Sequence, residues 1–185
     1  TRGVGRIGNL PPGTAENSAT YVHATLFGVW SLFMMGEDKA AWEQLIKALP
    51  VTHAHLSATQ FVMSNSYSLN PEFSMDGESM SDWYTGAANV LIKTLVRCVF
   101  GVDATLEGVY IRPAAYMPFA SAKIRIAVRG CSVRVEYVKK GNGKRVFRVG
   151  GKFREAPPDP VSGAPALLLS EADLKGETLV ISVED

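Results

Sequence analysis

The sequence predicts an α+β fold in which helices come first and strands second. Up to about residue 103, apolar side chains recur at the 3.6-residue spacing of helices. Beyond that point the period changes to two, as in strands with one solvated face. A chain of 185 residues with 46% hydrophobic content can bury a sizeable core. We therefore expect a helical part over residues 1–103 and an antiparallel β domain over residues 104–185.

The first helices are predicted by their apolar spacing and by glycine and proline at their ends. The irregular residues 1–19 precede a helix over residues 21–35, which is apolar on nearly every side and therefore expected to be buried all round. A second, amphipathic helix over residues 38–49 ends at Pro50 and should form a helical hairpin with the first. Such a buried helix needs more cover than these residues provide, so we expect further helices upstream of residue 1.

The strands are predicted by alternation. We expect strands at residues 109–111, 122–128, 132–138, 146–149 and 178–183. Gly130 should turn between the second and third of these strands, and Lys140-Gly141-Asn142-Gly143 should form a hairpin turn between the third and fourth. Lys123 and Arg125 alternate with apolar neighbours, which indicates a solvated sheet face more than a binding patch.

Charge and cysteine usage limit the classes of function. The 19 basic and 18 acidic residues give a net charge of +1, so neither nucleic acid nor an anionic membrane is an expected partner. The apolar run at residues 26–35 is too short to span a membrane, and we expect a cytoplasmic protein. Cys98 and Cys131 have no metal-ligand spacing. They are expected to be buried thiols, and a disulfide between them stays open.

The segment Ser81 to Ala88 carries the strongest local signal of a binding site. It follows a long loop over residues 51–82 and leads into a helix predicted over residues 84–100. A helix that begins at Thr85-Gly86 presents free backbone N–H groups, a hydroxyl and the positive end of its dipole. An anion or sugar hydroxyls could bind there. An ordinary capped helix start explains the same residues.

Three histidines are further candidates. His23 lies one turn inside an apolar helix and is either a satisfied core group or a ligand-binding group. Glu16 and Asn17 precede that helix and could reach the same place. His53 and His55 have no carboxylate or cysteine partner nearby, so we expect no metal site.

Several short segments occur together in an order typical of one enzyme family. They are Glu16-Asn17 ahead of Tyr21-Val22-His23-Ala24, and the segments at residues 43–50, 60–65, 83–88 and 106–113. In this order and spacing they resemble the C-terminal part of glycoside hydrolase family 94, the inverting disaccharide phosphorylases that include cellobiose phosphorylase. The resemblance covers about residues 14–135.

The resemblance implies a fold and a reaction. The fold would be the last helices of an (α/α)6 barrel over residues 1–103, followed by a C-terminal β-sandwich tail. The reaction would be cleavage of a β-glucosidic bond by inorganic phosphate, which gives α-glucose 1-phosphate without a cofactor. Its partners would be an oligosaccharide, phosphate and the remainder of the same enzyme, with a homodimer left open. The general acid, an aspartate, would lie upstream, so this chain would contain no catalytic residue and would be inactive alone.

The resemblance also assigns roles to individual residues. The phosphate-binding residues would be His23, Asn65, Thr85 and Gly86. Asn65 stands where cellobiose phosphorylases carry a glutamine, which has the same hydrogen-bonding groups on a longer side chain. Glu16 would line the acceptor subsite. Tyr84 and Ala87 depart from the family pattern, so cellobiose and β-glucan oligosaccharides both remain open as substrates.

Two other classes of function stay open. A barrel hydrolase or a glucan-synthase-associated domain would need a carboxylate base, for which Asp76, Glu78 and Asp82 are the candidates. A non-catalytic carbohydrate-binding module would use residues 104–185, although the aromatic residues there are scattered. A phosphorylase needs an anion-binding site in place of the base, because phosphate is already a nucleophile.

Overall fold

A computed structural model describes residues 3–57, 59–141 and 143–185, which form two compact units. The first, here called the helical unit, comprises residues 1–31 and 40–92. The second, the β unit, comprises residues 32–39 and 93–185. The last helical turn ends at Val99 and the strands of the β unit begin at Val102, close to the expected residue 103. The assignment of residues 1–103 to a barrel and of 104–185 to a separate domain stays a prediction.

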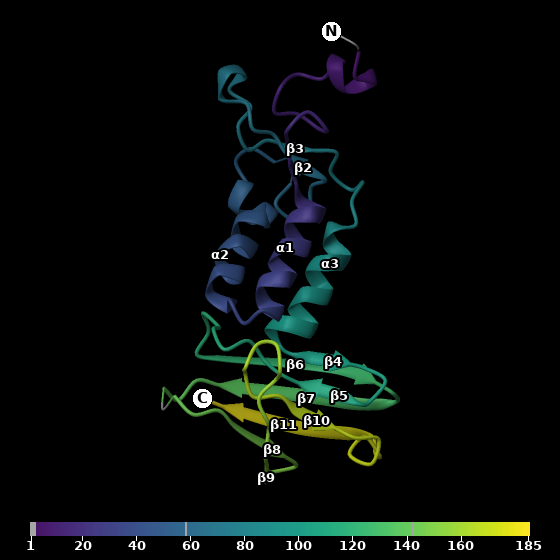
Figure 1. Cartoon of the computed structure of the whole chain (residues 1–185), viewed down its shortest axis with the longest axis vertical. Helices are drawn as coiled ribbons and strands as arrows, with labels where there is room; N and C mark the ends of the chain where they lie inside the picture. The colour runs from purple at the N-terminus through teal and green to yellow at the C-terminus, as the bar shows by residue number, and fades with distance from the viewer. Residues whose placement is uncertain (1–2, 58, 142) are drawn as a thin grey trace. The chain divides into compact units, whose positions relative to one another are not determined.

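The predicted helices are present, with a later start for the third. They are α1 (Val22–Met34), α2 (Asp38–Ala48) and α3 (Ala87–Thr94), and α3 continues into the π-helical turn η4 (Leu95–Val99). Figure 1 shows α1 between α2 and α3. The third helix begins at Ala87 instead of residue 84, because the Thr85 hydroxyl accepts a hydrogen bond from the Ala87 N–H and ends the preceding loop.

Helix α1 buries one side and exposes the other. Val22, Leu26 and Val29 are at most 1% exposed, whereas Phe27 is 53% exposed. The expectation that this helix is buried all round is therefore wrong for the described residues. The spacing of the three buried side chains is that of an amphipathic helix whose outer face also happens to be apolar.

The long loop before α3 is more ordered than the sequence indicated. It contains two strands of a small antiparallel sheet in the order β1 (Thr20–Tyr21), β2 (Ser66–Tyr67) and β3 (Ser79–Met80). Single-turn helices η1 (Gly5–Asn9), η2 (Pro50–His53) and η3 (Pro71–Phe73) complete this region. Buried polar side chains stabilise it: the Ser68 hydroxyl donates to the Met75 carbonyl, and the Asn70 amide donates to the Pro12 carbonyl. Strands this short leave no periodic signal in a sequence.

The β unit contains two sheets. One has the order β10 (Leu167–Leu169), β5 (Val109–Ile111) and β4 (Val102–Ala104). The other has the order β6 (Ser121–Val128), β7 (Cys131–Val138), β11 (Thr178–Glu184), β8 (Val146–Val149) and β9 (Lys152–Arg154). All five predicted strands are confirmed, and β4, β9 and β10 are additional strands of three residues each.

The pairing in the larger sheet differs from the prediction. Strand β11 runs parallel to β7, so the β part is mixed and not purely antiparallel. It also lies between β7 and β8, so residues 140–143 do not connect two paired strands and the predicted hairpin is wrong. Asn142 itself lies outside the described residues. The turn at Gly130 is confirmed, with Arg129 and Gly130 both at positive φ. Lys123 and Arg125 are exposed, as expected of a solvated face.

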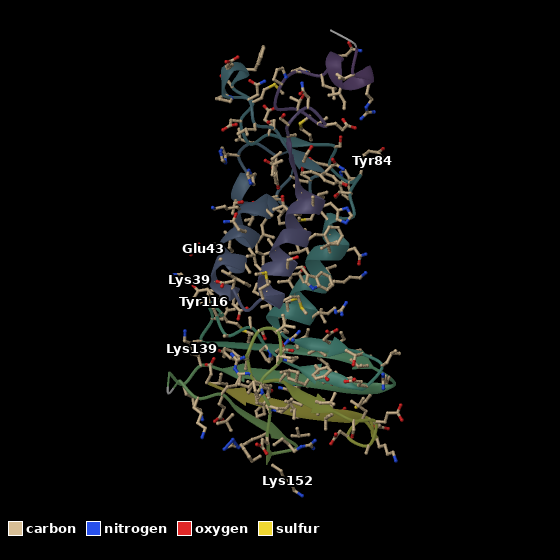
Figure 2. The ribbon with its side chains drawn as sticks, in the orientation of Figure 1. Lys39, Glu43, Tyr84, Tyr116, Lys139 and Lys152 are labelled. Atoms are coloured by element: carbon tan, nitrogen blue, oxygen red, sulfur yellow. The ribbon has the colours of Figure 1, made fainter. Side chains whose placement is uncertain are left out.

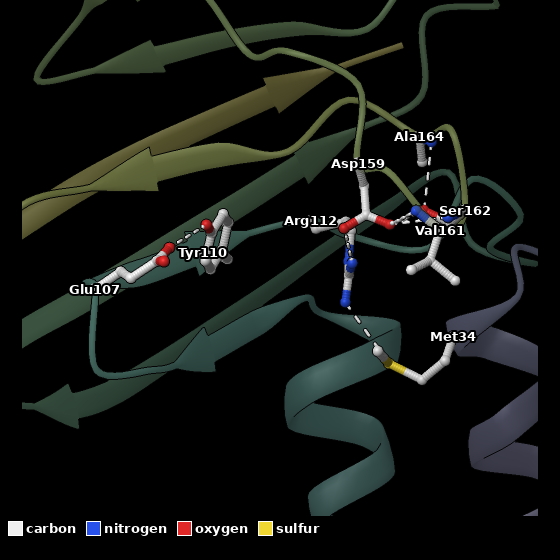
Figure 3. A network of polar contacts seen from close by, with 8 residues as sticks. All are labelled: Met34, Glu107, Tyr110, Arg112, Asp159, Val161, Ser162 and Ala164. Carbon is white, nitrogen blue, oxygen red and sulfur yellow. Dashed lines mark hydrogen bonds and ion pairs between the residues drawn. The ribbon is translucent and has the colours of Figure 1, made fainter.

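A polar network fastens the loop before β10 to the end of β5 (Figure 3). Arg112 forms an ion pair with Asp159, and its other terminal nitrogen lies 3.6 Å from the sulfur of Met34. Asp159 also accepts hydrogen bonds from the backbone N–H groups of Val161 and Ser162 at 3.1 and 2.8 Å. Burial alone would raise the pKa of Asp159, but the hydrogen bonds from Ser162 and the charge of Arg112 hold it below its usual value.

Both cysteines are buried free thiols, which confirms one of the two open possibilities. Burial raises the pKa of Cys98 to about 12, so this thiol is unreactive in the folded protein. Among residues 3–57, 59–141 and 143–185, every helix is too short or too polar to cross a membrane.

Candidate functional site

The structure brings together His23 and Gly86, two residues predicted to bind phosphate. A β-carbon added to Gly86 would lie 2.7 Å from Cε1 and 3.1 Å from Nε2 of His23. The imidazole therefore lies against the start of α3, and only glycine at position 86 is small enough to leave room for it. Gly86 does not have a positive φ, so glycine is needed here for the close approach of the ring and not for its backbone conformation.

Asn65 fastens the beginnings of two helices to each other. Its backbone carbonyl accepts a hydrogen bond from the Val22 N–H at 3.0 Å, at the start of α1. Its side-chain amide donates to the Tyr84 carbonyl at 2.9 Å, just before α3. Asn65 thus links the start of α1, which carries His23, to the turn at Thr85-Gly86 through two hydrogen bonds. This structural role does not depend on whether Asn65 also contacts a ligand.

Thr85 caps α3 and retains a donor. Its hydroxyl oxygen accepts from the Ala87 N–H at 3.0 Å, which confirms the capped-helix interpretation. A hydroxyl that accepts a hydrogen bond still has its own hydrogen to donate. The capped helix start and an anion site are therefore compatible, because the positive end of the α3 dipole and the His23 ring lie at the same place.

His23 is half-buried and not a fully enclosed core histidine. Its ring packs against Phe27 one turn along α1, with ring centroids 4.9 Å apart. Tyr21 meets it edge-on, at 6.0 Å between centroids and 70° between ring planes. The Tyr21 hydroxyl oxygen is 3.5 Å from His23 Nδ1.

A polar cavity of about 610 Å³ lies in the same unit. It is lined by Arg6, Ala15, Glu16, Ser18, Ala19, Tyr21, Asn65, Ser66, Ser81 and Tyr84. Figure 2 shows Tyr84 projecting from the segment before α3. Two aromatic rings, several hydroxyls, an amide and one charged pair form a lining suited to sugar rings, and the volume is in the range of small-molecule sites.

Glu16 lies in this cavity, where the resemblance placed the acceptor subsite. Its carboxylate forms an ion pair with Arg6. A hydrogen bond from its own backbone N–H lowers the pKa of Glu16. Burial raises this pKa in part, and the hydrogen bond and charge of the Arg6 guanidinium lower it again, so that the net shift is downward. Glu16 is therefore an ionised hydrogen-bond acceptor at neutral pH and not a proton donor.

Among the cavity residues, Arg6, Tyr21 and Tyr84 were not predicted as site residues from the sequence. Arg6 belongs to an irregular segment without periodicity, and Tyr84 was noted only as a departure from the family pattern. Tyr21 was counted as an apolar helix residue, but it belongs to strand β1. Its position two residues before His23 could have indicated that the two side chains lie on the same side of the chain.

The other histidines have structural surroundings. His53 Nε2 is 2.9 Å from the Lys47 carbonyl oxygen, and its ring stacks on Tyr67 with centroids 3.9 Å apart. His55 is exposed. Within the described ranges, no three histidine, cysteine, aspartate or glutamate side chains are grouped so that they could hold a metal ion.

The carboxylates proposed as an alternative base are dispersed. Asp76 is exposed and Glu78 is half-buried. Asp82 accepts a hydrogen bond from the Ser79 hydroxyl at 2.9 Å, which fixes it within the turn before α3. Burial raises the pKa of Tyr67 to about 12, and the negative charge of Asp82 contributes to this shift.

The start of α3 lies against a histidine, in the same unit as a cavity with hydroxyl, amide and aromatic groups. The chain is similar to glycoside phosphorylases. Cellobionic acid phosphorylase of Neurospora crassa is 28% identical to it in an alignment of 162 residues that covers 83% of this chain and 20% of that protein. The 3-O-beta-D-glucopyranosyl-beta-D-glucuronide phosphorylase of Paenibacillus borealis is 25% identical in an alignment of 138 residues that covers 71% of this chain and 18% of that protein. No protein-family profile matches the sequence.

The chain therefore spans about a fifth of the length of the curated relatives it matches. The expected relationship to phosphorylases is confirmed. Membership of glycoside hydrolase family 94, the barrel and the roles of individual residues stay predictions.

Proposed function

We propose that this chain is the C-terminal part of an inverting glycoside phosphorylase, which cleaves a β-glucosidic bond with inorganic phosphate to give α-glucose 1-phosphate. The contact between the His23 ring and Gly86 at the start of α3 is the observation that carries the proposal. The similarity to two phosphorylases supports it. In this proposal residues 1–103 belong to an (α/α)6 barrel, and the two sheets of the β unit form a sandwich.

His23, Thr85 and the start of α3 would bind and orient phosphate, which is the nucleophile of the reaction. Phosphate attacks the anomeric carbon from the face opposite the leaving group, so it must be held in one orientation while its charge is partly compensated. The His23 N–H, the Thr85 hydroxyl and the N–H groups at the start of α3 would donate to phosphate oxygens. The leaving oxygen needs an acid, and we assign none to this chain. No cofactor is required.

The cavity of the helical unit would hold the leaving sugar. Both relatives are named for substrates that carry a carboxylate, and Arg6 offers a cation in the cavity lining. A guanidinium has five N–H donors, so Arg6 can hold Glu16 and a substrate carboxylate together. An acidic leaving sugar is thus an alternative to the neutral sugar of cellobiose or a β-glucan oligosaccharide.

Phosphorolysis by the full-length protein tests the proposal. Wild-type protein should release glucose 1-phosphate from a β-glucoside in the presence of phosphate. His23→Ala and Thr85→Ala should lower kcat/KM for phosphate by about 10²-fold or more, because each removes a donor to the developing charge. His55→Ala, at an exposed histidine, is the matched control and should keep wild-type kinetics. Reverse reactions with glucose, cellobiose, gluconate and glucuronate as acceptors would identify the leaving sugar.

The alternatives make different predictions. A hydrolase with Asp76, Glu78 or Asp82 as its base would release free glucose without phosphate, and one of the three alanine variants would abolish that release. For a sugar-binding module, Tyr137 and Phe147 of the β unit are only 2% and 1% exposed. Its exposed Phe119 and Phe153 belong to different segments of the chain. Sugar binding by a protein unable to carry out phosphorolysis would favour the module.

A further inference from the structure

Tyr21 lies where the cavity and the His23 ring meet. It lines the cavity of the helical unit, and its hydroxyl oxygen is 3.5 Å from His23 Nδ1. The phenol is therefore in a position to decide which ring nitrogen carries the proton.

The local fold fixes Tyr21 in this place. Tyr21 pairs with Ser66 in the small sheet, so its backbone is extended immediately before α1 begins. The Thr25 hydroxyl donates to the Tyr21 carbonyl at 3.1 Å, which ties the strand to the first turn of the helix. Phe27 packs on the His23 ring at a centroid distance of 4.9 Å. These contacts fix the backbone of Tyr21 and cover one side of the His23 ring.

We infer that Tyr21 is a positioning residue that holds His23 in the tautomer with its proton on Nε2. A neutral imidazole has one N–H donor and one acceptor nitrogen. When the Tyr21 hydroxyl donates to Nδ1, the proton must reside on Nε2, as in histidines oriented by a second hydrogen bond. A β-carbon placed on Gly86 would lie 3.1 Å from Nε2 and 3.3 Å from Nδ1, so both ring nitrogens lie at the start of α3. With Nδ1 engaged by Tyr21, Nε2 is the nitrogen left to donate there. The opposite tautomer would present a lone pair to an anion.

This inference rests on the proposed function for its catalytic consequence, but not for the tautomer itself. Tyr21→Phe keeps the ring and its edge contact and removes only the hydroxyl. In the full-length enzyme this variant should raise KM for phosphate about three- to tenfold, the usual effect of one lost hydrogen bond. The thermal midpoint should stay at its wild-type value. Tyr110→Phe, which removes a tyrosine hydroxyl bonded to Glu107 in the β unit, is the control for hydroxyl loss.

The nitrogen signals of histidine test the tautomer directly. In ¹⁵N-histidine-labelled full-length protein, the His23 signals, assigned by their loss in His23→Gln, should show a protonated Nε2 and an unprotonated Nδ1. Tyr21→Phe should move both signals toward a mixture of tautomers, and Tyr110→Phe should not move them. Unchanged signals and an unchanged KM for phosphate in Tyr21→Phe would overturn the inference. Failure of the proposed function would appear differently, as a wild-type enzyme that does not need phosphate, and the nitrogen signals would still decide the role of Tyr21.

Discussion

Replacement of Gly86 by alanine tests the geometry of the candidate phosphate site at a single atom. The new β-carbon would lie 2.7 Å from Cε1 of His23, whereas ordinary contacts begin at 3.4 Å. The imidazole must therefore move by about 0.7 Å, the difference between these distances. The backbone can accept alanine, because Gly86 lacks a positive φ.

The expected effect is large on activity and small on stability. A displacement approaching 1 Å of a catalytic group costs up to about 10²-fold in rate, so kcat/KM for phosphate should fall about 10- to 100-fold. Loss of backbone freedom in the unfolded chain favours Gly86→Ala, while the weaker capping preference of alanine disfavours it. The net change in the free energy of unfolding should stay within about 1 kcal/mol.

Initial rates of glucose 1-phosphate formation at varied phosphate, together with denaturant unfolding, measure both quantities. Gly28→Ala is the matched control, because a β-carbon on this residue of α1 meets no atom within 4 Å. It should leave the kinetics unchanged and stabilise the helix by about 0.5–1 kcal/mol. Wild-type phosphate kinetics in Gly86→Ala would refute the reasoning that the contact between Gly86 and His23 shapes the site.

Three further predictions concern stability and thiol chemistry. Gly101→Ala should lower the free energy of unfolding by about 3 kcal/mol or more in urea unfolding. Gly101 has φ +68°, and a β-carbon there would overlap the backbone after β5. A decrease in this free energy below about 1 kcal/mol would contradict the described turn. The hydrogen bond from Arg154 lowers the pKa of Asp173 to about 2, whereas the pKa of an aspartate in the unfolded chain is about 4. The carboxylate therefore stabilises the fold fully at pH values above about 4, and this stabilisation is lost as the pH falls toward 2. The difference in Tm between wild type and Asp173→Asn should accordingly shrink from pH 5 to pH 2, and a constant difference would exclude the linkage. Cys98 and Cys131 should resist iodoacetamide at pH 8 in the native protein and react in denaturant, whereas rapid native labelling of Cys98 would contradict its burial.

The sequence predicted elements whose residues repeat over several turns or pairs. Val22, Leu26 and Val29 identify α1 because their spacing is that of one helix face. The alternation of Lys123 and Arg125 with apolar residues identifies β6 and its exposed face in the same way. These patterns say which side chains share a face, and that much of the fold follows from local physics.

The same patterns do not say which strands are neighbours. Strand β11 alternates like the other strands, and nothing in its residues specifies that it enters between β7 and β8 in parallel with β7. The strands β1, β2 and β3 have two residues each, too few for any period. Their position depends on buried hydrogen bonds of residues such as Ser68, which a sequence does not display.

The candidate site was predictable where motifs were local. His23, Thr85 and Gly86 were singled out from the sequence, and the structure places His23 against Gly86 and Thr85 at the cap of the same helix. Arg6 was not predicted, because it joins the site through an ion pair with Glu16 from the single-turn helix η1, which is too short to leave a periodic signal in the sequence. Side-chain contacts of such short segments are not read from a local pattern.

The phosphate dependence of product formation by the full-length protein tests the central claim most directly. With a β-glucoside substrate, the account predicts that α-glucose 1-phosphate appears only when phosphate is present and that its rate saturates with phosphate concentration. Release of free glucose at a rate that phosphate does not change would contradict the account. His23 and the start of α3 would then form a capped helix beside a sugar-binding cavity, without a role in phosphorolysis.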